Sequence, residues 1–107
     1  MNSDRIAALR AQCGGPRDGA LLRFSLGNAL LDGGDGDGAR AELQRAVEFD
    51  PNYSAAWKAL GKACLAQHDE DGAAAAWRQG IAVATGRGDQ QAAKEMTVFL
   101  KRLARRG

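Results

Sequence analysis

The sequence has few residues that favour β-strands. Valine, isoleucine, threonine and tyrosine are scarce, and only six of the 107 residues are aromatic. The residue types that pack well on a pleated sheet are therefore lacking. Alanine and leucine dominate the hydrophobic 45% of the chain, which also has 14 glycines, and 107 residues suffice for one compact domain but not for two. We predict an all-α fold in a single domain spanning residues 1–107.

Residues suited to catalysis or metal binding are also few. The one histidine, His68, follows an apolar stretch and precedes three acids, a setting more typical of a surface turn than of a general base. Cys13 and Cys64 show neither CxxC spacing nor a companion histidine cluster, which favours reduced, buried thiols over a disulfide or a zinc site. No glycine-rich phosphate loop follows a strand. We therefore expect no enzymatic activity, no metal and no cofactor.

Long apolar runs are absent. The longest, from Ala73 to Trp77, is far too short to span a bilayer, and no signal-peptide core precedes the domain. These features predict no membrane span and a cytoplasmic location. The net charge is +2, with four cations in the last seven residues. Because basic residues complement a helix C-terminus, this favours a solvated helix end over a nucleic-acid-binding tail.

A 34-residue period organises most of the chain. Leu26-Gly27 recurs as Leu60-Gly61, and in the same register the segment 20–53 matches 54–87, including its Asp- and Gly-rich turn. A fixed period of this length is typical of helical repeat arrays, in which neighbouring units stack and present a surface to a partner.

Apolar spacing predicts helices near 3–13, 18–32, 38–49, 54–67, 72–84 and 89–105. Asn2 or Ser3 is expected to cap the first, Asn52 or Ser54 the fourth and Asp89 the last. Gly86 and Gly88 are expected to break the chain before the last helix. A glycine inside a helix costs about 1 kcal/mol relative to alanine, so Gly27 predicts a closely packed neighbouring helix.

The second copy reads Trp57, Leu60, Gly61, Cys64, Ala73, Trp77, and the first reads Arg23, Leu26, Gly27, Leu30, Ala39, Leu43, Ala46, Pro51. This pattern resembles the tetratricopeptide repeat (TPR), here in a small two-repeat protein of bacterial type. The chain departs from the pattern where Arg23 replaces a tryptophan, Leu30 and Cys64 a tyrosine, Gly80 an alanine and Thr85 a proline. The two tryptophans fall on core positions of the repeat.

The resemblance implies an α-α superhelix of two helix pairs, repeats 20–53 and 54–87, between an N-terminal capping helix and a C-terminal solvating helix that caps the other end. The first helix of each pair would line a concave groove for a peptide or partner helix, in an adaptor or assembly role. The implied groove residues are Leu21, Phe24, Asn28, Leu31, Ala55, Lys58, Lys62 and Leu65.

Within this groove, Asn28, Lys58 and Lys62 could bind a partner's acidic side chain or free C-terminus beside an apolar shelf of Phe24, Leu31 and Leu65. The equal alternative is two lysines on a solvated helix face. Family members with a carboxylate clamp take further basic ligands from a third repeat that is absent here.

Other functions stay open at the level of sequence. The basic C-terminal helix could bind nucleic acid or another acidic surface. Two repeats are few for a stable stack, so the chain could also self-associate as a structural dimer, and we expect a monomer or weak homodimer. A calcium loop at residues 32–38 is disfavoured, because Gly33 and Gln44 occupy two anchoring ligand positions.

Overall fold

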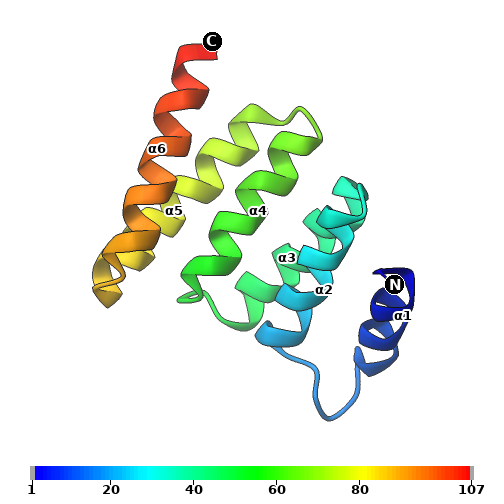
Figure 1. Cartoon of the computed structure of the whole chain (residues 1–107). Coiled ribbons are helices and arrows are strands. Elements are labelled where there is room, and N and C mark those ends of the chain that lie inside the picture. The colour runs from blue at the N-terminus through cyan, green and yellow to red at the C-terminus, as the bar shows by residue number, and fades with distance from the viewer. Residues whose placement is uncertain (1, 107) are drawn as a thin grey trace.

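The computed structural model describes residues 2–106, and over this range the chain forms six α-helices and no strand (Figure 1). The helices are α1 (Asn2–Gln12), α2 (Ala20–Asp32), α3 (Gly36–Phe49), α4 (Ser54–Ala66), α5 (Glu70–Arg87) and α6 (Gln90–Arg106). The all-α prediction is confirmed.

Sequential helices pack against each other along the whole stack. α2 pairs with α3 and α4 with α5, while α1 covers α2 and α6 covers α5. α2, α4 and α6 lie along one side of the molecule, with α3 and α5 behind them (Figure 1). One continuous apolar core runs from α2 to α6 and includes Leu26, Leu43, Trp77 and Met96. This is the predicted superhelix of stacked helix pairs.

The two repeated glycines lie where a side chain of the second helix of each pair packs directly against the first. An added Cβ on Gly27 would lie 2.5 Å from Leu43 Cγ, and one on Gly61 would overlap Trp77 Nε1 and lie 2.5 Å from Trp77 Cδ1. Leu43 and Trp77 occupy the same position in the two repeats. The predicted reason for a helical glycine, close packing of the partner helix, therefore holds in both copies.

The turns inside the two pairs share one hydrogen-bonding pattern. The side chain of Asp35 accepts from Gly38 N at 2.8 Å, and that of Asp69 accepts from Gly72 N at 2.9 Å. These N-caps satisfy backbone donors that have no partner within the helix. Because Asp35 is the cap, α3 begins at Gly36, two residues earlier than predicted.

Each of these turns also places one residue in the left-handed region. Gly34 has a φ of 85° in the first repeat, and His68 has a φ of 61° at the equivalent position of the second. The next residue's N–H then donates to a carbonyl five residues back, Leu30 O in one repeat and Cys64 O in the other, both at 2.9 Å. His68 is exposed and serves here as a helix-stopping turn residue.

The C-terminal end of α5 lies beyond the predicted one. α5 continues through Gly86 to Arg87, and only Gly88, with a φ of 76°, stops it. Gly86 is exposed, and nothing lies within 4 Å of an added Cβ. A single helical glycine therefore did not break the helix, because its cost of about 1 kcal/mol is small beside the packing of the rest of α5.

The predicted caps are partly wrong. The N-cap of α4 is Tyr53, which makes no side-chain cap bond, and neither Asn52 nor Ser54 takes that role. Ser54 is buried, and its hydroxyl donates to Asp89 Oδ2 at 3.0 Å. Asp89 does cap α6 as predicted, because its Oδ1 accepts from Ala92 N. One carboxylate thus ties the start of α6 to the start of α4.

The first helix packs against the rest of the fold only through partly buried side chains. α1 contains no buried residue, and its Ile6 and Leu9 pack partly buried against the core. Asn2 lies inside the helix, and its amide donates to Ala29 O at 2.8 Å, so it does not act as the predicted cap. α1 therefore binds to α2 through one hydrogen bond and a few apolar contacts.

Only one tryptophan and one cysteine are fully in the core. Trp77 is 2% exposed, and its Nε1 donates to Lys58 O at 3.1 Å. Trp57 is half-buried, packs against the edge of the core and donates from Nε1 to Pro51 O at 2.8 Å, so its predicted packing role is confirmed but its ring is not fully enclosed. Cys64 is buried as predicted, and both thiols are free, but Cys13 is only partly covered.

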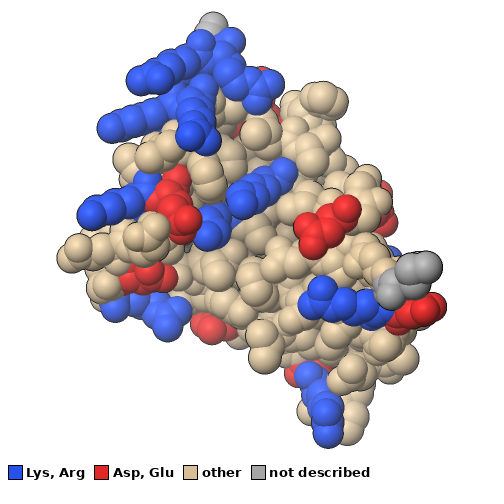
Figure 2. Space-filling view, in the orientation of Figure 1, with Lys and Arg blue, Asp and Glu red and all other residues tan. Residues whose placement is uncertain are grey.

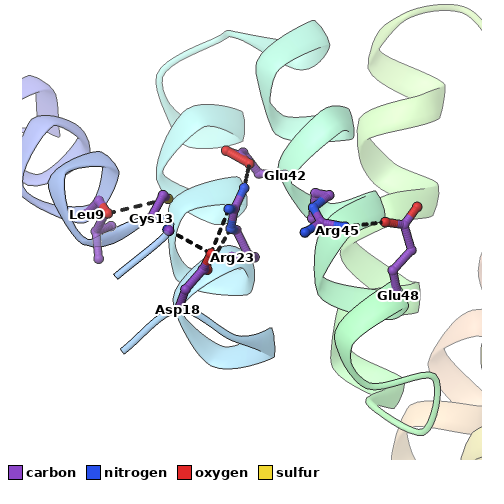
Figure 3. A network of polar contacts seen from close by, with 8 residues as sticks. Leu9, Cys13, Asp18, Arg23, Glu42, Arg45 and Glu48 are labelled. Carbon is purple, nitrogen blue, oxygen red and sulfur yellow. Dashed lines mark hydrogen bonds and ion pairs between the residues drawn. The ribbon is translucent and has the colours of Figure 1, made fainter. Parts of the chain in front are cut away.

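Arg23 stands where the repeat pattern has a tryptophan, and a polar network replaces the ring (Figure 3). Its Nε and Nη2 donate to the two carboxylate oxygens of Asp18, and its Nη1 donates to Glu42 Oε1, each at 2.8 Å. Asp18 also accepts from Gly14 N at 2.9 Å. The guanidinium and the Gly14 N–H hold the pKa of Asp18 well below its usual value, and Asp18 in turn raises the pKa of Arg23. The network fastens the α1–α2 linker to α2 and α3.

Candidate binding groove

A hollow of about 280 Å³ lies between α2 and α4. Phe24, Asn28 and Leu31 line it from α2, at spacings that place them on one helix face. Ala55, Lys58 and Lys62 line it from α4 in the same way. Asp32 of α2 and Ala59 of α4 complete the lining. Six of the eight groove residues predicted from the repeat register thus meet around this first hollow.

The charge of the first hollow is largely balanced within the chain. Lys58 Nζ lies 3.1 Å from Glu95 Oε1 of α6, which is outside the lining, and Asp32 is an acid within the lining. No ion pair within residues 2–106 involves Lys62. The two lysines predicted to act together are therefore unequal, since one of them already has an acidic partner.

Phe24, which lines this hollow from α2, forms an aromatic pair with the N-cap residue of α4. Phe24 and Tyr53 pack with ring centroids 4.9 Å apart at 42°. Burial raises the pKa of the Tyr53 hydroxyl, so Tyr53 is neutral at physiological pH. The predicted residue Leu21 is 68% exposed and lines neither this hollow nor the second one described below, which makes it the outlying member of the predicted set.

A second hollow of about 340 Å³ lies between α4, α5 and the C-terminal half of α6. Its lining consists of Lys62, Leu65, Trp77, Phe99, Arg102, Leu103 and Arg106. Lys62 belongs to both hollows, so the two adjoin along α4. The last predicted residue, Leu65, lies here.

Sequence reasoning missed the contribution of α6 to this surface. Phe99 and Leu103 are four residues apart, as are Arg102 and Arg106, and that spacing places all four on neighbouring rows of one helix face. The sequence alone predicts only a solvated helix end for these arginines. Figure 2 shows Lys and Arg side chains gathered around the C-terminal end of α6.

Lys62 is held beside an aromatic floor. Its Nζ lies 5.4 Å from the centroid of the Phe99 ring, a cation–π distance. Phe99 in turn packs on Trp77 with ring centroids 5.2 Å apart. The ammonium group is thus positioned at the boundary between the hollows.

Two other kinds of site can be checked over residues 2–106. Within that range no helix combines the length and the apolar character needed to cross a bilayer. Nor do three or more His, Cys, Asp or Glu side chains come together there in a way that could hold a metal ion. Asp35 and Asp69, the acids of the turns, are engaged as helix caps.

Helix pairs that repeat every 34 residues and stack beside a groove define a helical-repeat protein. Solved structures show the same fold. Protein BPP2914 from Bordetella parapertussis has a TM-score of 0.80 and 48% identity, covering 96% of this chain and 87% of that one. The Sgt2 TPR domain from Aspergillus fumigatus has a TM-score of 0.74 and 25% identity, covering 99% and 72%.

Sequence relatives identify the family. The family model described as TPR repeat matches residues 27–68. TPR repeat-containing protein PA0015 of Pseudomonas aeruginosa is 59% identical over 88 residues, which make up 82% of this chain and 84% of that protein. The chain therefore belongs to the TPR repeat family. TPR proteins are generally protein–protein interaction modules and typically non-catalytic scaffolds.

Proposed function

We propose that this chain is an adaptor that binds a peptide or helix of a partner protein along the groove formed by α2, α4 and α6. The observation that carries the proposal is the pair of adjoining hollows on one side of the stack, which share Lys62. Concave, mainly apolar surfaces with a few convergent polar groups are the usual form of a binding site.

The polar groups of the first hollow suit a polypeptide ligand. Asn28 can donate to and accept from a peptide backbone at the same time. A ligand carboxylate at Lys58 would have to compete with Glu95, which lies 3.1 Å from the ammonium group. Lys62, which has no acidic partner within residues 2–106, is the better cation for an acidic group of the ligand.

Site-specific photo-crosslinking tests this function. A benzoylphenylalanine placed at Asn28, in the groove, is compared with one placed at Ala41, on the exposed face of α3. Each variant is expressed in the native host and illuminated, and the crosslinked proteins are identified by mass spectrometry. We expect the groove position to crosslink a discrete partner through a defined segment of that partner.

The control position decides how the result is interpreted. Both replaced side chains are small and only partly buried or exposed, so both variants should fold. A partner that crosslinks from Ala41 and not from Asn28 would show that binding takes place on the other side of the stack, and the groove function would then be wrong.

A further inference from the structure

The second hollow differs from the first in its charge. Lys62, Arg102 and Arg106 line it without any acidic side chain. No ion pair among residues 2–106 involves these three cations. The first hollow, in contrast, contains Asp32 and the already paired Lys58. An anionic ligand therefore gains more electrostatic stabilisation in the second hollow than in the first.

The floor of the second hollow is apolar. Leu65, Phe99 and Leu103 are partly or fully buried side chains that face it, and Trp77 lies beneath Phe99. A volume of about 340 Å³ is at the lower end of the roughly 300–1,000 Å³ typical of small-ligand pockets. The space suits one bulky apolar side chain better than an extended ligand.

The cations stand beside this floor. Arg102 follows Phe99 by three residues and Arg106 follows Leu103 by three, so each guanidinium projects next to one of the apolar side chains. Lys62 faces them from α4. Arginine favours carboxylate ligands because its planar fork can donate two parallel hydrogen bonds to them.

Building on the groove function proposed above, we infer that the second hollow binds an acidic segment of the partner protein, with a bulky apolar residue flanked by Asp or Glu. The apolar side chain packs on Phe99, Leu65 and Leu103. The flanking carboxylates meet Arg102, Arg106 and Lys62.

A protein segment fits this surface better than a nucleic acid does. Single strands are bound by several exposed aromatic rings on which successive bases stack. Here the hollow offers one partly buried ring, Phe99, which already contacts Trp77 and the Lys62 ammonium. The neighbouring hollow presents Asp32, which would repel a phosphate backbone that continued along the groove.

A titration of the full ¹⁵N-labelled chain tests the inference. The probe is an acetylated and amidated hexapeptide, Glu-Asp-Leu-Phe-Glu-Asp, followed by two-dimensional NMR. One control peptide carries Gln and Asn in place of its acids, and another carries Ala-Ala in place of Leu-Phe. We expect the largest shifts at Lys62, Leu65, Phe99, Arg102 and Arg106, and much weaker binding of both control peptides.

Two double variants with the same net charge separate specific binding from general attraction. The double variant Arg102→Glu with Arg106→Glu should bind the probe peptide about tenfold more weakly, since two attractive charge contacts become repulsive. Lys101→Glu with Arg105→Glu makes the same change on the same helix outside the hollow. There we expect at most about a twofold loss, because neither side chain lines the hollow and salt screens interactions between exposed charges. The spectra themselves report whether each variant is folded.

Several results would overturn the inference. One is an equal loss in both double variants, and another is equal binding of the peptide that lacks acids. If oligothymidylate shifted the NMR signals of the same residues at a lower concentration than the peptide does, the site would be assigned to nucleic acid. An absence of shifts at millimolar peptide would also contradict it. Shifts confined to Phe24 and Asn28 would overturn this site while leaving the groove function intact.

Discussion

Replacing Gly61 by alanine tests the packing that sets the repeat register. The new Cβ would overlap the indole of Trp77, which is 2% exposed and donates to Lys58 O. Because Phe99 packs on the same ring, the indole has little room to move. Overpacking of this kind costs about 1–3 kcal/mol, and alanine's better helix propensity returns about 1 kcal/mol. We expect a net loss of up to about 2 kcal/mol.

Gly86→Ala is the matched control. Gly86 also lies inside α5, but nothing is within 4 Å of its added Cβ, so the same substitution should stabilise the fold by about 0.4–1 kcal/mol. Urea unfolding followed by circular dichroism measures both changes. In thermal unfolding each kcal/mol corresponds to a shift of about 4–8 °C. If Gly61→Ala stabilised the protein as much as Gly86→Ala, the close approach of α4 and α5 would be refuted.

Three further predictions concern stability. Trp77→Ala should destabilise the fold by about 3–5 kcal/mol in urea unfolding, and the half-buried Trp57 should matter less when it is truncated; equal losses would contradict the difference in burial. Asp35→Ala removes an N-cap and should cost about 1 kcal/mol in the same assay, whereas no change would show that the cap contributes nothing. Because the pKa of Asp18 is lowered in the folded state, its ion pair with Arg23 stabilises the protein above the unfolded-state pKa of about 3.9, and that contribution is lost as the pH falls below it. Asp18→Asn should flatten the acid limb of the stability curve, and an unchanged acid limb would argue against the network.

Much of the fold could be predicted because the 34-residue register repeats the same packing problem. Gly27 and Gly61 face equivalent side chains, and Asp35 and Asp69 make equivalent caps. For an element with a counterpart 34 residues away, both copies of the repeat therefore support the same structural prediction. Ser54 had no such support: its hydroxyl turns to Asp89, 35 residues on, and no local pattern shows that contact.

The candidate site could likewise be predicted only where its residues follow the repeat register. Groove positions on α2 and α4 follow from the register, and six of them line one hollow. α6 lies outside the register. Its apolar stripe could therefore be predicted, but the hollow that its basic residues line could not. The pairing of Lys58 with Glu95 likewise joins residues 37 positions apart. Only the three-dimensional structure shows that one predicted cation is neutralised and that two others lie beside an apolar floor.

The most direct test of the groove is the affinity of the crosslinked partner for Lys62→Glu, because Lys62 is the residue that both hollows share. Arg45→Glu, on the exposed face of α3, makes the same change in charge outside the groove. In isothermal titration calorimetry we predict about tenfold weaker binding for Lys62→Glu and unchanged binding for Arg45→Glu. Unchanged affinity in Lys62→Glu, with a loss in Arg45→Glu, would contradict the assignment of the groove as the binding surface.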